Sequence, residues 1–243
     1  FFQIGEISSF KVFSGLMSDY FYLKPSKKRK SEHLALIGMS GAGKSYWSKK
    51  MEDSGFRRYS CDDLIAERLG SKLSKNGKST LNLAKWMGKP FSKGYSEAEE
   101  LYLELEGEVV TSICNELENF STKSEPVVVD TTGSLIYLNK VLLKRLRNLV
   151  RTVHLNLPIE KHRELFEAYL LDPKPVIWKG KYVPLKRETP QKTLRRCYGE
   201  LLSFRSERYG LISDYVLDYS FHHCPETDLA ELLELICFNK DDS

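Results

Sequence analysis

A glycine-rich loop near residue 40 has the residue types and spacing of a phosphate-binding site. The pattern G-x-x-x-x-G-K-S is matched by Gly38, Gly43, Lys44 and Ser45. Glycines let consecutive backbone N–H groups point inward around phosphate oxygens, where a Cβ atom would obstruct them. Lys44 supplies a mobile positive charge for the outer phosphates, and the Ser45 hydroxyl can ligate Mg²⁺. We therefore expect this loop to bind ATP and Mg²⁺. The residues expected to contact the nucleotide are Gly38, Met39, Ser40, Gly41, Ala42, Gly43, Lys44, Ser45 and Tyr46.

The sequence on either side of the loop favours this interpretation over a chance match. Residues 34–37 form an apolar run that predicts a buried strand, and residues 46–51 can continue as a helix. A strand, a glycine loop and a helix in this order are the context that the motif requires. The positive N-terminal end of the helix adds to the attraction for phosphate.

Two aspartates occupy positions where acids assist catalysis. Asp62 follows a short predicted strand and starts a helix, so it is a candidate to orient the acceptor hydroxyl or to take its proton. The alternative is a helix N-cap, which Asp favours. Asp130 ends the apolar run 126–130, the position of an acid that holds Mg²⁺ directly or through water. The alternative there is a turn residue at a strand end.

Two cations are further candidates for the site. Residues 172–190 contain four prolines and many charges, which predicts a long loop of the kind that closes over a bound ligand. Lys174 in this segment would stabilise the charge that develops on the transferred phosphoryl group. The alternative for Lys174 is an exposed loop lysine. Arg205 lies within a predicted helix, where a solvated charge is the ordinary interpretation, and its role as a clamp for an anionic group is implied only by the family resemblance described below.

The predicted elements alternate along the chain. Strands are expected at 34–37, 56–60, 126–130, 152–157 and 215–219, and helices at 46–51, 62–69, 81–87, 96–118, 138–149, 159–171, 191–209 and 228–237. Such alternation predicts a parallel sheet covered on both faces, and so a three-layer α/β/α fold with a five-stranded parallel sheet. For helix 96–118 we expect a capping box, with Ser96 at the N-cap and Glu99 three residues later.

Composition limits the class of protein. The chain has 243 residues, of which 41% are hydrophobic and 29% charged, as expected for one domain with an appendage. We place the appendage, an aromatic arm and a basic linker, at 1–30 and the domain at 31–243. The run 27–30 is basic, which fits a solvated linker or a nuclear-targeting signal.

Charge and cysteine spacing bear on partners and compartment. The net charge of +4 is spread along the chain, so we expect no nucleic-acid partner, and no apolar run suggests a membrane partner. None of the five cysteines forms a C-x-x-C pair, which favours free thiols in a reducing compartment, the cytoplasm. We also expect a monomer whose partner is a small-molecule acceptor.

Four motifs together resemble one family of P-loop kinases. They are the loop 38–45, the stretch Ser60-Cys61-Asp62 with Ile65 and Gly70, the pair Thr132-Gly133, and Arg205 with Tyr209 and Asp214. Lys174-Pro175-Val176-Ile177 is also similar to the lid motif of that family. From about residue 33 to residue 237 the chain resembles the shikimate kinases, which have the nucleoside-monophosphate-kinase-like fold. The resemblance implies transfer of the ATP γ-phosphate to a hydroxyl, with Asp62, Gly133 and Arg205 at the acceptor and Lys174 in the lid.

The chain also departs from that family at the acceptor. Ser60 stands where the family has its first Asp, Ser96 where it has an Arg that holds the shikimate carboxylate, and Lys174 where it has a lid Arg. A bidentate Arg clamp is not replaced by Ser, and an insert separates Gly70 from Ser96. We therefore expect a small, anionic metabolite other than shikimate as acceptor.

Two other functions remain open from the sequence. One is a nucleotide-binding protein with a regulatory, non-catalytic role, suggested by the lost Asp and Arg positions. The other is a nucleoside or nucleotide kinase, which shares the fold. That function calls for an arginine-rich lid, whereas the segment 172–190 is rich in lysine.

Overall fold

The centre of the structure is a parallel sheet whose strands come from across the whole domain. The computed structural model describes residues 32–73, 80–120 and 125–237. The five strands are β1 (Leu34–Ile37), β2 (Arg57–Ser60), β3 (Val127–Asp130), β4 (Arg151–Leu155) and β5 (Tyr215–Leu217). They lie in the order β2-β3-β1-β4-β5, and every neighbouring pair is parallel. This confirms the predicted five-stranded parallel sheet.

The central strands are continuous apolar runs because both of their faces are covered. All four residues of β1 and residues 127–129 of β3 are 0% exposed. At the edge, β2 is less buried: Arg57 is exposed, Arg58 and Ser60 are partly buried, and Tyr59 is buried. Burial therefore follows the position of each strand in the sheet.

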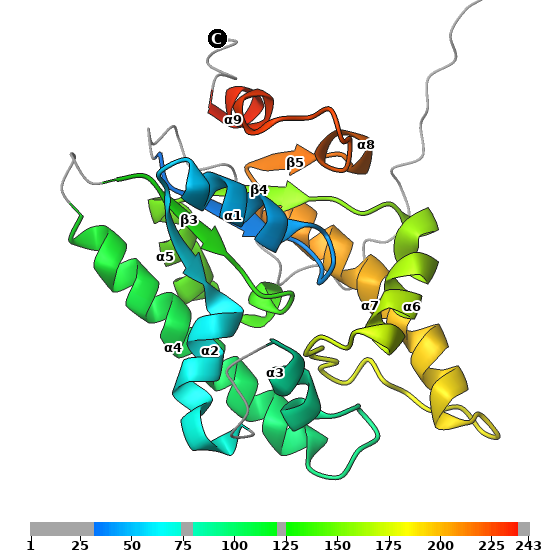
Figure 1. The fold of residues 1–243 in the computed structure, drawn as a ribbon. Coiled ribbons are helices and arrows are strands. Elements are labelled where there is room, and N and C mark those ends of the chain that lie inside the picture. Colours follow the sequence, from blue (N-terminus) through cyan, green and yellow to red (C-terminus); the bar gives the residue numbers. More distant parts are fainter. Residues whose placement is uncertain (1–31, 74–79, 121–124, 238–243) are drawn as a thin grey trace, which may run out of the picture.

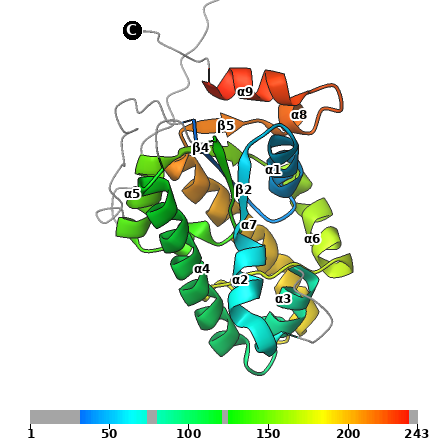
Figure 2. The same ribbon diagram turned by 60° about the vertical axis from the view of Figure 1, so that its left-hand side comes forward.

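Helices form a layer on each face of the sheet. On one face lie α1 (Lys44–Asp53) and α9 (Leu229–Cys237), and on the other α4 (Tyr95–Glu118), α5 (Lys140–Leu149) and α7 (Pro190–Ile212) (Figures 1 and 2). The remaining helices are α2 (Cys61–Leu69), α3 (Thr80–Met87), α6 (His162–Leu171) and α8 (Tyr219–His222), with short 3₁₀ turns at Gly70–Lys72, Leu135–Tyr137 and Ile159–Lys161. This arrangement confirms the three-layer α/β/α fold.

The structure corrects two expectations about helix N-caps. Helix α4 begins one residue earlier than predicted, and its N-cap is Gly94 with φ 82° and no side-chain cap. The capping box of Ser96 and Glu99 is therefore wrong: Ser96 is exposed, and the Glu99 carboxylate is buried against another segment. At α2 the cap is Ser60, whose hydroxyl accepts from the Asp63 N–H, so Asp62 is not the N-cap.

The structure bears on three further expectations, which concern the N-terminal arm, membrane-spanning helices and the cysteines. The predicted arm and linker, 1–30, lie outside the described residues. Within the part of the chain that the structure describes, no helix has the length and apolar character needed to cross a bilayer. Cys61, Cys114, Cys197 and Cys224 carry free thiols, as expected.

Candidate active site

Strand register brings the predicted site residues to one edge of the sheet. Asp130 is paired with Leu36 of β1 and with Ser60 of β2. Since the strands are parallel, the loops that follow all three lie together at their carboxyl ends, where α/β proteins bind ligands. The glycine loop, Asp62 and the loop after Asp130 therefore share one site.

The glycine loop has a shape that only glycine permits. Gly38 and Gly41 have φ values of 143° and 86°. A Cβ atom at Gly38 would lie 2.9 Å from the Leu155 carbonyl oxygen, and one at Gly41 would lie 2.9 Å from the Leu165 Cδ2 atom. The left-handed Gly43 is the N-cap of α1, so the loop leads directly into the positive end of that helix. These features fit a cradle for phosphate.

Lys44 lies against this loop. Its side chain is 7% exposed, and Nζ donates to the carbonyl oxygens of Gly38 at 2.9 Å and Met39 at 2.8 Å. Burial lowers the pKa of Lys44, while Asp130 and Asp62 act in the opposite direction. The ammonium thus has two weak backbone acceptors that phosphate oxygens can replace.

The other residues expected to contact the nucleotide include both buried and exposed side chains. Met39 and Ala42 are buried in the core, so only their backbone can face a nucleotide. Ser45 is exposed at the start of α1, where its hydroxyl is accessible to a metal. Tyr46 is 56% exposed, and its ring packs against Trp47 and Lys50.

Asp130 carries an ion pair that the sequence did not reveal. Its Oδ2 atom accepts from Arg58 Nη2 at 2.9 Å and from Ser48 Oγ at 3.2 Å, and Arg58 Nε also donates to Ser48 Oγ at 2.8 Å. Arg58 belongs to β2. Ser48 lies four residues after Lys44, one helical turn along α1, and this spacing is a sequence signal that could have identified Ser48 as a site residue. A metal at Asp130 would share this carboxylate with a guanidinium.

Asp62 is fixed by a tyrosine from α4. The Tyr102 hydroxyl donates to Asp62 Oδ1 at 2.6 Å. Burial raises the pKa of Asp62, whereas this hydrogen bond and Lys44 lower it. A carboxylate held in this way beside a lysine is suited to accept a hydrogen bond from an acceptor hydroxyl.

A buried glutamate, also missed by sequence analysis, holds the loop after Asp130. Glu106 is 0% exposed, and its carboxylate accepts from Thr132 Oγ1 and, at 2.6 Å, from Ser134 Oγ. Burial raises the pKa of Glu106 to about 7. The two hydroxyls flank Gly133, whose carbonyl accepts from the Tyr209 hydroxyl at 2.6 Å. The loop is thus fixed from two sides.

Gly133 brings the loop next to Arg205. A Cβ atom at Gly133 would lie 3.3 Å from the Ser40 backbone nitrogen and 3.4 Å from Arg205 Nη1. Arg205 is 3% exposed, so it is not a solvated helix charge. Its Nη2 atom donates to the Ile177 carbonyl, and its Nε atom is buried without a hydrogen-bond partner among the described residues. A buried guanidinium with a spare donor can bind an anion.

Lys174 is not gathered with the other site residues. Its side chain is 40% exposed and forms an ion pair with Asp172 at 2.7 Å. The segment 172–190 leaves the end of α6, approaches α3 and returns to the start of α7 (Figure 1). Its role as a lid therefore stays a prediction.

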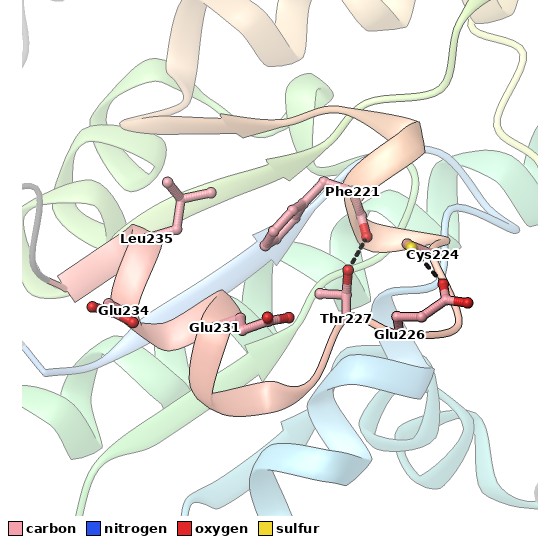
Figure 3. A pocket seen from close by; sticks show the side chains of 7 residues that line it. All are labelled: Phe221, Cys224, Glu226, Thr227, Glu231, Glu234 and Leu235. Atoms are coloured by element: carbon pink, nitrogen blue, oxygen red, sulfur yellow. Dashed lines mark hydrogen bonds between the residues drawn. The ribbon is translucent and has the colours of Figure 1, made fainter.

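A separate pocket lies between α8 and α9 (Figure 3). Its lining residues all belong to the stretch 221–235 and include the acids Glu226, Glu231 and Glu234. None of the predicted site residues lines it. Acidic side chains repel phosphate, so this pocket is unsuited to the phosphate groups of a nucleotide.

Comparison with known proteins identifies the fold. No model of a protein family matches the chain, and no curated protein sequence matches it significantly. The architecture and the glycine loop define a P-loop α/β/α protein. Among solved structures, a shikimate kinase from Acinetobacter baumannii in complex with shikimate is similar, with a TM-score of 0.54, 19% identity, and coverage of 86% of this chain and 94% of that one.

A shikimate kinase from Bacteroides thetaiotaomicron gives a nearly equal match. The TM-score is 0.53 at 18% identity, with coverage of 84% of this chain and 97% of that one. The chain therefore has the fold of the shikimate kinases, as the motifs predicted. At this level of identity the likeness establishes the fold and leaves the activity to the site residues.

Proposed function

We propose that this protein is an ATP-dependent kinase that transfers the γ-phosphate to a hydroxyl of a small, anionic metabolite. The observation that carries the proposal is the convergence of Lys44, Asp62 and Arg205 at the carboxyl edge of the sheet. They supply a cation for the phosphates, an acceptor for a hydroxyl proton and a buried cation for an anionic group. The fold, which kinases share, supports this assignment.

The residues present fit ATP and Mg²⁺. The positive φ values and close backbone contacts of Gly38 and Gly41 form a cradle that side chains would fill. Ser45 and Asp130 would hold the metal ion, which would offset charge on the β- and γ-phosphates. Lys44 would exchange its bonds with the loop carbonyls for bonds with phosphate oxygens.

On the acceptor side, three residues have distinct roles in the proposed reaction. Asp62, oriented by Tyr102, accepts a hydrogen bond from the attacking hydroxyl and takes its proton as the new oxygen–phosphorus bond forms. The bond between the γ-phosphorus and the β–γ bridging oxygen breaks, and ADP leaves. Arg205 binds the anionic group of the acceptor beside Gly133. Lys174 approaches from the lid when the segment 172–190 closes.

A phosphotransfer screen tests the proposal. Purified protein is incubated with Mg-ATP and sugar acids, polyols, shikimate or nucleosides, and phosphorylated products are measured beside the Lys44→Ala variant. We expect transfer to an anionic acceptor that the variant does not support. Transfer only to nucleosides would instead favour a nucleoside or nucleotide kinase.

One observation favours a second candidate, a nucleotide-binding protein without transfer activity. Asp130 is already paired with Arg58, and Ser60 and Ser96 replace charged residues of the similar family. Binding of an ATP analogue without transfer to any acceptor in the screen would support that regulatory role.

A further inference from the structure

A polar stripe runs along the buried face of α4. Tyr95, Glu99, Tyr102 and Glu106 follow each other at spacings of four, three and four residues, so they lie on one side of the helix. Their exposed fractions are 6%, 8%, 2% and 0%. Buried polar side chains require hydrogen-bond partners, and each of these four side chains has one.

The stripe contacts three separate segments of the proposed site. Tyr102 holds Asp62, and Glu106 holds the loop around Gly133, as described above. Glu99 and Tyr95 hold residues 176–179 of the predicted lid segment, which we call the lid root. One helix therefore positions three segments that are distant in sequence.

Glu99 and Tyr95 each make two hydrogen bonds with the lid root, and those of Glu99 join it to a carboxylate. The Glu99 Oε1 atom accepts from the backbone N–H groups of Trp178 at 2.5 Å and Lys179 at 2.9 Å. The same oxygen accepts from the Tyr95 hydroxyl at 2.7 Å. Lys179 has φ 45°, a left-handed conformation that turns two consecutive N–H groups toward one acceptor.

Helix α7 holds the lid root from the opposite side. Arg205, the proposed acceptor-binding residue, donates to the carbonyl of Ile177, the residue before Trp178. Ile177 and Trp178 are each 1% exposed, so the lid root is a buried anchor. Lys174 lies four residues before Trp178, and its path toward the nucleotide is set by where this anchor sits.

We propose that Glu99 is a positioning residue that fixes the lid root, so that the lid segment can close over the nucleotide and deliver Lys174. The proposal rests on the proposed function for its catalytic consequence, but its structural part does not. Removing the Glu99 carboxylate leaves the Lys179 N–H without its acceptor, and the Trp178 N–H keeps only the Tyr95 hydroxyl at 3.0 Å. The lid root then leaves its position while the glycine loop stays intact.

The experiment compares Glu99→Ala, Glu99→Gln and the control Glu100→Ala, which changes an exposed residue of the same helix. Hydrogen exchange is measured with and without a non-hydrolysable ATP analogue, together with analogue affinity. For Glu99→Ala we expect faster exchange at 176–180 and loss of analogue-induced protection over 172–190, with affinity within about threefold of wild type, because the glycine loop is unchanged. Glu99→Gln, whose amide oxygen can still accept, restores protection.

Kinetics supply the second readout. Glu99→Ala should lower kcat by about ten- to hundredfold, the cost typical of a misplaced catalytic group, while KM for ATP changes little. Unchanged exchange at the lid root, or faster exchange spread evenly over the chain, would overturn the proposal. If wild-type protein transfers no phosphate, the proposed function fails, whereas the exchange experiment still decides the role of Glu99.

Discussion

Lys44 is the residue whose loss should affect ATP most directly. Its Nζ atom lies against the glycine loop and bonds only to backbone carbonyls there. We expect Lys44→Ala to abolish phosphotransfer and to weaken ATP binding, because no other cation in the glycine loop can meet the outer phosphates. Isothermal titration with an ATP analogue and product assays measure both. Turnover close to wild type would mean that the loop is not the phosphate site.

Asp62 should affect the chemical step more than nucleotide binding. It lies at the proposed acceptor end of the site, and its carboxylate accepts a hydrogen bond from the Tyr102 hydroxyl. We expect Asp62→Asn to lower kcat by about 10²-fold or more with little change in ATP affinity, the range of a general base or orienting group. Equal losses in ATP binding and in turnover would point to a structural role. Asp63→Asn, which changes the neighbouring exposed acid, is the matched control.

His154 should make stability depend on pH. It is 2% exposed beneath the glycine loop, neither ring nitrogen has a hydrogen-bond partner among the described residues, and burial lowers its pKa to about 4. The unfolded state takes up a proton near pH 6.5, whereas the folded state does so only near pH 4. The contribution of neutral His154 to the free energy of unfolding is thus complete above pH 6.5 and declines as the pH falls from 6.5 to 4.

A variant comparison isolates this effect. Glu106 acts in the opposite direction, because its pKa is raised to about 7 and its contribution declines as the pH rises from 4.5 to 7. We therefore compare urea unfolding of wild type and His154→Phe at pH 7 and pH 5. The stability of wild type relative to the variant should fall by about 2 kcal/mol at pH 5. A difference that does not change with pH would show that folding does not lower the pKa of His154.

Among the structural elements, the segment 172–190 is the one expected to change with nucleotide. Its root is buried, but Val183 and Leu185 are each 54% exposed and Lys174 is 40% exposed. Apolar side chains left exposed in a long loop are available to pack when the loop closes. An ATP analogue should therefore slow hydrogen exchange over 180–189 more than over 176–179, which is already anchored. Equal exchange with and without the analogue would remove the lid from the mechanism.

Helix α4 shows why an element can be predicted correctly while its role is missed. Its residues Leu105, Val109 and Ile113 recur every four positions on one face of the helix and are buried in the core. Of the buried polar residues, only Glu99 was interpreted from the sequence, as part of a capping box. The partners of these polar residues in other segments lie 26 to 83 residues away in sequence, so no local pattern could identify them.

For the molecule as a whole, we expect shikimate to be a poor acceptor. Ser96, where the similar family has a carboxylate-binding Arg, is exposed. A lost hydrogen bond to a charged group costs roughly 1.5–3 kcal/mol, or at least about tenfold in binding. Arg205 alone would then hold the carboxylate. Steady-state kinetics decide: a KM below about 1 mM with kcat above about 1 s⁻¹ would show that another residue has replaced the clamp.

The sequence by itself determined the fold and the position of the glycine loop. Both follow from local rules: apolar runs in alternation with helices predict a covered parallel sheet, and glycines at fixed spacing predict a loop that turns backbone N–H groups inward. The five strands and every helix but α8 were accordingly predicted to within a few residues, whereas Tyr219, expected to end the last strand, instead begins α8. The glycine loop required no tertiary information.

Only the tertiary structure decided which polar residues share the site. Strand register pairs Asp130 with Ser60 and brings Arg58 onto its carboxylate. Helix packing buries Arg205 and places Glu106 against the loop of Gly133. Such contacts join segments that are far apart in sequence, and a buried charge is tolerated only where packing supplies its partner. Burial and partner choice are therefore properties of the assembled fold, which the local sequence of Arg205 or Glu106 does not encode.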